Sequence, residues 1–165
     1  FNTMSLVTLG LSKIEVGDIG AEGGMGETLA PLGYTYQDTC KMTQEDPETT
    51  EHYAEEVDDP IVSISRGGKT NFAFSIMDAD VNVLKTLFGG TVTGDSWSAP
   101  AKLPAIEKSV RITPEQGLKF DIPRMKLASK INGEFSKKGL FLIDVAGTVL
   151  QPTKADEPKM TATKI

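Results

Sequence analysis

The sequence predicts a mainly β protein with a single α-helix, and two features of the chain lead to this prediction. Apolar and polar residues alternate in several stretches with a period of two, which is the pattern of strands that bury one face. Only one stretch, between Ala79 and Phe88, has apolar residues at helical spacing. With 165 residues, of which 39% are hydrophobic, the chain has the size of a single domain, residues 1–165, with one core.

The first part of the chain predicts a short strand, a glycine-rich loop and a longer strand. Ile14 and Val16 lie on one face of the short strand. We expect residues 20–33 to form a long mobile loop, because each glycine loses more conformational entropy on folding than any other residue. Residues 34–43 then alternate as a strand with one polar face. That polar face contains Thr35, Gln37 and Thr39.

An acid-rich segment follows between Glu45 and Asp59. Pro47 and its acidic neighbours predict a turn, after which residues 49–57 return as a strand. The glycine pair at 67–68 predicts a tight turn, so we expect residues 61–66 and 71–77 to pair as a hairpin.

The predicted helix carries a wide apolar surface. Asp78 is the expected N-cap, and Gly89 fits the left-handed residue that ends a helix. Two interpretations of the apolar surface remain open: both of its stripes enter the core, or the second stripe contacts another subunit. The first stripe consists of Val81, Leu84 and Phe88, and the second of Val83 and Leu87.

The second half of the chain predicts two hairpins. Residues 110–112 pair with residues 118–122, and residues 125–135 pair with residues 140–149. Two turns compete for the second hairpin, and we prefer Ser136 to Gly139 over Asn132-Gly133 because it leaves two strands of similar length. The alternation places Lys126, Lys130 and Asn132 on one polar face.

The end of the chain, residues 151–165, reads as a C-terminal extension. Residues 151–158 are a polar linker, and residues 160–165 have the pattern of one edge strand.

Composition argues against several functional classes. A net charge of −6 repels phosphate backbones, which argues against a nucleic-acid-binding protein. The single cysteine, Cys40, reads as a small core residue and cannot form an internal disulfide. The sequence has no apolar run that predicts a membrane anchor and no pattern that predicts a signal peptide.

The sequence predicts no enzyme activity, no metal and no cofactor. His52 is the only histidine, whereas a zinc site needs three or four ligands and a hydrolytic triad needs a positioned base. A pair of carboxylates between Glu45 and Asp59 is an alternative of the glycosidase type, but dense acidic runs are more often solvated surface. The glycines at 20–26 lack the spacing of a phosphate-binding loop.

Several stretches, taken in order, resemble one known family. They are Glu45-Asp-Pro-Glu, Glu51-His-Tyr-Ala-Glu-Glu, Asp59-Pro-Ile-Val-Ser-Ile-Ser, Asn71-Phe-Ala-Phe-Ser-Ile-Met-Asp, Leu87-Phe-Gly-Gly, Ser96-Trp-Ser-Ala-Pro and Phe135-Ser-Lys-Lys-Gly-Leu-Phe-Leu-Ile-Asp-Val. In their order and in the types of residues they contain, they resemble the major tail tube proteins of bacteriophages. The resemblance extends over residues 34–149, which is most of the chain.

The resemblance implies a tail-tube-like β-sandwich or partly closed β-barrel with one flanking α-helix. It implies a structural virion protein, assembled in the cytoplasm of the bacterial host, whose copies form a hexameric ring. Stacked rings form the tail tube, which conducts DNA without specific or adhesive contacts, and other tail proteins are its further partners. The tube proteins of type VI secretion and related contractile injection systems share this fold and are an alternative.

A monomeric carbohydrate-binding or adhesion β-sandwich is a third reading. That reading predicts exposed aromatic platforms, whereas aromatic residues are 7% of the chain and Trp97 is its one tryptophan.

Two sets of residues are candidates for contacts within such a tube. The candidate lumen strands contribute Thr35, Gln37, Thr39, Lys126, Lys130 and Asn132. The candidate subunit interface contains Val83, Leu87, Glu45, Glu48, Glu51, Glu55 and Glu56. The acidic segment and the glycine loop are expected at contacts between rings, becoming ordered on stacking.

Overall fold

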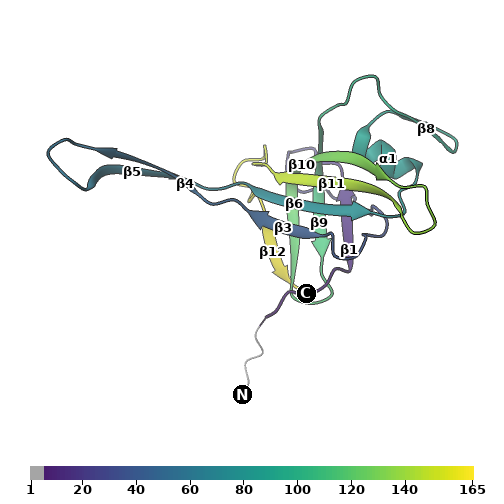
Figure 1. Cartoon of the computed structure of the whole chain (residues 1–165), viewed down its shortest axis with the longest axis horizontal. Helices are drawn as coiled ribbons and strands as arrows, with labels where there is room; N and C mark the ends of the chain where they lie inside the picture. The colour runs from purple at the N-terminus through teal and green to yellow at the C-terminus, as the bar shows by residue number, and fades with distance from the viewer. Residues whose placement is uncertain (1–5) are drawn as a thin grey trace, which may run out of the picture.

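The computed structural model describes residues 6–165 and is mainly β, with one helix, as the sequence predicts (Figure 1). The elements are β1 (Lys13–Gly17), β2 (Ala30–Pro31), β3 (Lys41–Gln44), β4 (Glu48–Tyr53), β5 (Pro60–Arg66), β6 (Thr70–Ile76), α1 (Val81–Phe88), β7 (Thr91–Thr93), β8 (Ser96–Ser98), β9 (Ile106–Thr113), β10 (Leu118–Gly133), β11 (Phe141–Val149) and β12 (Thr161–Lys164).

Eight of these strands form one antiparallel sheet. Its order is β2-β1-β9-β10-β11-β6-β3, and β12 pairs with the first part of β10. Two small hairpins, β4–β5 and β7–β8, lie outside this sheet. The path of strands has two free ends, so the strands within residues 6–165 do not close into a barrel.

The long strand β10 joins two parts of the sheet that run in different directions (Figure 1). Its pairing with β9 shifts register between Ile122 and Met125, next to Pro123, which has no N–H for the ladder. The Ser109 hydroxyl donates to the carbonyl of Pro123 at 2.8 Å and accepts the amide of Gly26 at 2.9 Å. A buried serine therefore satisfies the backbone at the bend.

The core lies between the two parts of this bent sheet. Buried side chains of β1 belong to the same cluster as those of β6, although β9, β10 and β11 stand between these two strands in the sheet order. Because those strands are not neighbours in the ladder, the sheet must curve toward itself. The cluster contains Ile14, Val16, Leu32, Phe72, Phe74, Ile76, Leu87, Phe88, Val110, Ile112, Ile122, Met125, Leu127, Ile143 and Val145.

The helix begins two residues later than predicted. Asp80 is the N-cap, accepting the amides of Asn82 and Val83 at 3.0 Å. Asp78, the expected cap, instead accepts the amide of Tyr34 at 2.6 Å. Gly89 ends the helix with φ of 76° and donates its N–H to the Lys85 carbonyl, as the sequence predicts.

Residues of both apolar stripes pack in the core, as the first of the two interpretations expects, so the candidate interface residues Val83 and Leu87 do not form a free surface. Leu87 is only 1% exposed, and Val83 is half-buried against the same cluster. The β7–β8 hairpin covers part of the helix through Trp97, whose ring lies 5.9 Å from that of Phe88. Its indole N–H donates to the carbonyl of Gly89.

The predicted pairing of residues 61–66 with residues 71–77 is also wrong. β5 pairs with β4, and β6 pairs with β3 and β11. The glycine pair at 67–68 is not a turn, because Glu45 still donates its amide to Lys69 across from it. A Cβ on Gly68 would meet the carbonyl oxygen of Glu45, so only glycine fits where these two segments approach each other.

The predicted strand over residues 34–43 is interrupted. Thr35 pairs with Ile76 in a single bridge, and the chain then turns outward at Asp38, whose φ is 62°. Regular pairing with β6 begins only at Lys41. A residue in the left-handed conformation breaks the alternation, and aspartate tolerates it better than most side chains.

The remaining strand predictions are confirmed. β9 and β10 pair as expected, and β10 pairs with β11 across a turn that includes Ser136 and Gly139. β12 forms at the predicted edge. The glycine-rich segment packs more closely than the sequence predicts, because Gly23, Gly24 and Gly26 are buried and β2 pairs with β1.

Candidate assembly surfaces

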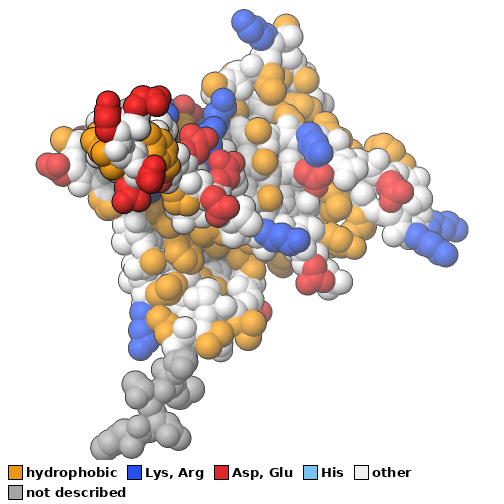
Figure 2. Space-filling model, turned by 60° about the vertical axis from the view of Figure 1, so that its left-hand side comes forward, with side chains coloured by type: hydrophobic (Ala, Val, Ile, Leu, Met, Phe, Trp, Pro, Cys, Tyr) orange, Lys and Arg blue, Asp and Glu red, His pale blue; other side chains and the backbone are white. Residues whose placement is uncertain are grey.

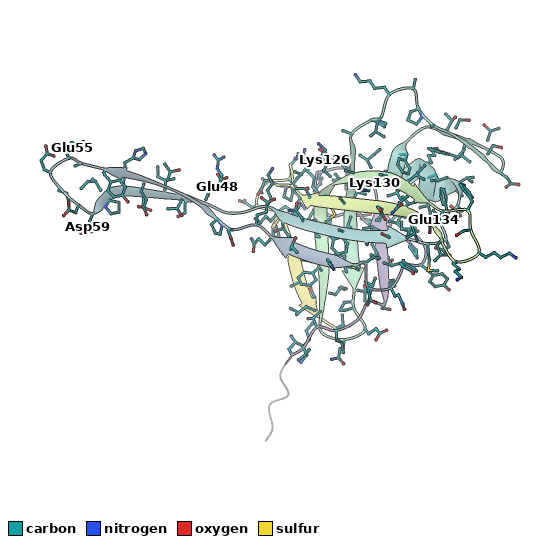
Figure 3. The ribbon with its side chains drawn as sticks, in the orientation of Figure 1. Glu48, Glu55, Asp59, Lys126, Lys130 and Glu134 are labelled. Carbon is teal, nitrogen blue, oxygen red and sulfur yellow. The ribbon has the colours of Figure 1, made fainter. Side chains whose placement is uncertain are left out.

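The β4–β5 hairpin is a long projection from the sheet, and we call residues 48–66 the arm (Figure 1). All residues of both strands are exposed. Its turn, residues 54–59, lies at the far end, and Figure 3 marks its length with Glu48, Glu55 and Asp59. An isolated two-stranded hairpin is marginally stable in water, so such a projection normally needs a surface to rest on.

One face of the arm is polar. Thr49 lies opposite Ser65 with their hydroxyl oxygens 3.3 Å apart, and Glu51 lies opposite Ser63. The Tyr53 hydroxyl donates to the Glu51 carboxylate at 2.6 Å. This face is well suited to contact with water.

The other face of the arm carries its apolar side chains, with the pair Glu48 and Arg66 at its base. Thr50 lies opposite Ile64, and His52 lies opposite Val62, so these four side chains share one face. Ile64 is 60% exposed and Val62 is 45% exposed. Ile61, the extra residue where the register shifts near the turn, is equally open at 60%.

This apolar face continues the buried face of the sheet. The register of β3 and β6, with Met42 opposite Phe72, runs unchanged into β4 and β5. Side chains alternate between faces, so Ile64 and Val62 lie on the same side as Phe72. Phe72 is buried in the core, whereas no other part of residues 6–165 covers the arm.

The acidity of the chain is concentrated on and next to the arm. Residues 45–59 contain eight acids and no lysine or arginine, whereas the rest of the chain has two more basic than acidic residues. Figure 2 shows the acids surrounding an apolar patch at the end of the arm. The candidate interface acids lie here and are exposed: Glu45, Glu48, Glu51, Glu55 and Glu56.

A second surface is the outward face of β10, β11 and β6, which we call the polar sheet face. The structure places Lys126, Lys130 and Asn132 together on it, all exposed, as their alternation predicts (Figure 3). Asp144 on β11 accepts the Ser75 hydroxyl at 2.6 Å and the Asn132 amide at 3.2 Å. A hydrogen-bonded row therefore crosses three strands.

The other predicted lumen residues do not form a strand on this face. Thr35 makes only a single bridge, and Gln37 lies in the outward turn. Thr39 is half-buried; its hydroxyl accepts the amide of Ser75 and donates to the carbonyl of Tyr36. Thr39 therefore holds the interrupted edge together.

The polar sheet face carries charges of both signs. Lys130 lies directly opposite Asp144, and Lys126 lies opposite Glu107. Arg124 binds both carboxylate oxygens of Glu107, at 3.0 and 3.1 Å, and this contact lowers the pKa of Glu107 below its ordinary value. The charges of this face are therefore interleaved.

No catalytic arrangement is found in the described chain. Within residues 6–165 no three metal-binding side chains lie together, and His52 is exposed on the arm. Burial raises the pKa of the Cys40 thiol to about 11, which suppresses the reactive thiolate. The part of the chain that the structure describes contains no helix long and apolar enough to cross a membrane.

The sequence reasoning missed Ile61, Val62 and Ile64 as surface residues. A signal was available: Pro60 and the acids before it make a natural turn for a hairpin between β4 and β5. The glycine pair at 67–68 gives a competing turn signal, which predicts the hairpin between residues 61–66 and 71–77.

Comparison with protein-family models and with curated proteins gives no match for this chain.

Proposed function

We propose that this chain is a structural tail tube subunit of a phage, whose copies assemble into stacked rings that conduct DNA. The observation that carries the proposal is the uncovered apolar face of the arm, which continues the buried face of the sheet. Burying a surface of this kind against a partner lowers the free energy, because apolar area is removed from water. Other copies of the same chain are a partner that is always present with it, so self-association can cover this face.

The edges of the sheet support the same proposal. Among residues 6–165, β2, β3 and β12 each leave one side without a strand partner in the sheet order. Unpaired edges invite pairing with another chain, and an assembly can use this pairing productively. In a ring, strands of neighbouring subunits would extend the bent, sandwich-like sheet into a continuous wall.

The polar sheet face is our candidate for the wall of the lumen. Apart from Leu142, its outward side chains are short, polar or oppositely charged in pairs, such as Lys130 and Asp144. A wall without a block of positive charge offers little counterion release to a passing polyanion. DNA would therefore slide past a hydrated surface and would not be retained.

The arm is our candidate for contacts beyond one subunit. Its acids Glu48, Glu51, Glu55 and Glu56 surround an apolar centre, which matches the layout of an interface with a polar rim. The glycine-rich segment is a weaker candidate than the sequence suggested, because it packs against its own chain near Ser109. The helix contributes to the fold of the subunit through Leu87.

Negative-stain electron microscopy of concentrated protein tests this proposal. The full chain is expected to form annular particles or tubes, and a variant with residues 48–66 replaced by Asn-Gly is expected to remain compact and single. The variant keeps the β3–β6 ladder and the core, so its circular dichroism and thermal unfolding control for folding. Full-length protein that stays monomeric at every concentration would contradict the proposal.

A further inference from the structure

A second hairpin carries an uncovered apolar surface at the other end of the molecule. We call residues 131–141, where β10 turns into β11, the tip. β10 leaves β9 after Leu127, and β11 pairs with β6 as far as Ile143, so within residues 6–165 the tip beyond the Ile131–Ile143 pair is also a two-stranded projection. Phe135 is 94% exposed, and its ring lies 5.7 Å from that of Phe141.

The apolar side chains of the tip lie on the core side of the sheet, as do those of the arm. Ile131 lies opposite the buried Ile143, and Phe141 lies opposite Gly133 on the same face. Ile131 is 51% exposed and Phe141 is 38% exposed. The buried face of one sheet thus runs past the core at both ends, and nothing in residues 6–165 covers either end.

The charges of the two ends are opposite. The turn of the arm contains Glu55, Glu56, Asp58 and Asp59, and the tip presents Lys137 and Lys138 with one acid, Glu134. Figure 2 shows acidic side chains gathered at the end of the arm.

Figures 1 and 3 place the arm and the tip at opposite ends of the longest axis. The arm therefore cannot reach the tip of its own chain, so any contact between them is made by two copies.

We infer that the arm of one copy docks on the tip of the next copy, apolar face to apolar face, with arm acids beside tip lysines. This inference rests on the proposed self-assembly and identifies the surface that receives the arm. The two surfaces differ, so the contact is heterologous and repeats from copy to copy. Opposite charges set its orientation and disfavour arm-to-arm and tip-to-tip pairing.

Charge reversal tests the inference without touching the core. In E55K/E56K the arm turn loses its net negative charge, because two lysines now stand beside Asp58 and Asp59, so its attraction to the tip lysines of other copies of that variant is lost. In K137E/K138E the tip becomes acidic and repels the unchanged arms of other copies of that variant. Each variant alone is expected to self-associate at least about tenfold more weakly than the unmodified protein in sedimentation velocity. An equimolar mixture is expected to assemble again, because the reversed arm of the first variant then meets the reversed, acidic tip of the second, and the unmodified arm of the second meets the unmodified tip of the first.

The matched controls carry the same charge changes at other exposed positions. They are D95K/E115K for the arm and K102E/K159E for the tip. These controls are expected to associate like the unmodified protein, both alone and mixed. A chain carrying both V57C and K138C is also expected to form intermolecular disulfides that link arm to tip, read by mass spectrometry of the peptides.

The outcomes separate this inference from the proposed function. Tubes that form equally well in both reversed variants would overturn arm-to-tip docking and leave the tube proposal standing. Mixed variants that restore only pairs or short chains, with no rings or tubes, would support docking and contradict the tube. Failure of the mixture to recover while each variant alone is impaired would also overturn the inference, as would disulfides joining arm to arm.

Discussion

Replacing Ile64 on the apolar face of the arm by serine should weaken assembly and leave the isolated subunit intact. Ile64 is 60% exposed in the single chain, and its complete burial is worth about 1.5–3 kcal/mol. Covering the exposed fraction therefore contributes about 1–2 kcal/mol to each contact, which corresponds to about a 5- to 30-fold change in the dissociation constant. Sedimentation velocity over a concentration series measures this change.

The opposite face of the arm provides the matched control. Thr49→Ala removes an exposed contact with Ser65 on the polar face and is expected to leave association unchanged. Thermal unfolding of dilute Ile64→Ser should match that of the unmodified subunit, because Ile64 makes no core contact. Equal dissociation constants for the serine variant and the unmodified protein would refute the reasoning, as would a marked loss of subunit stability.

Three further predictions concern the subunit itself. Leu87→Ala should lower the free energy of unfolding by about 2–5 kcal/mol in chemical denaturation, because it opens a cavity in the core, and an effect near zero would remove the helix from the core. Arg124 lowers the pKa of Glu107 in the folded state. The contact between the two side chains therefore stabilises the folded protein above the unfolded pKa of Glu107, about 4.3, and this stabilisation is lost as the pH falls. The melting temperatures of the unmodified protein and Glu107→Gln should therefore differ near neutral pH and converge in acid; a constant difference would contradict this. Cys40, with a pKa of about 11, should react with iodoacetamide more slowly in the folded protein than in denaturant at the same pH, and equal rates would contradict its burial.

Elements with a long regular pattern were the most predictable from sequence. The alternation over residues 125–135 predicted both the strand and the faces of β10, because a period of two has only one register that buries Leu127. The turn with Ser136 and Gly139 followed from the equal lengths of the two strands. Gly89 ended the helix as expected because its left-handed φ excludes most other residues.

Elements that depend on distant contacts were not predictable in the same way. Asp78 and Asp80 are equally good caps in sequence, and only the position of Tyr34 assigns the first to another contact. The width of the helix stripe suggested a partner, but the curvature of the sheet brings enough strands around Leu87 to bury it. Sequence does not encode this curvature locally.

The candidate surfaces were only partly predictable. The acids of residues 45–59 were recognised as an exposed interface candidate, whereas the apolar face beside them depended on the pairing of β4 with β5. In the sequence, the glycine pair at 67–68 is the stronger local turn signal, and it predicts a different partner for residues 61–66. The overall negative charge likewise gave no indication that the acids gather on the arm and leave the polar sheet face with interleaved charges.

Amide hydrogen exchange of residues 48–66 tests most directly whether copies of this chain cover its exposed apolar face. The measurement compares dilute protein with protein at a concentration at which it assembles, and it follows peptides of the arm and of β6 separately. Arm amides should exchange rapidly when dilute and become protected on assembly, while the core amides of β6 stay protected throughout. Arm amides that exchange equally fast at both concentrations would contradict the account.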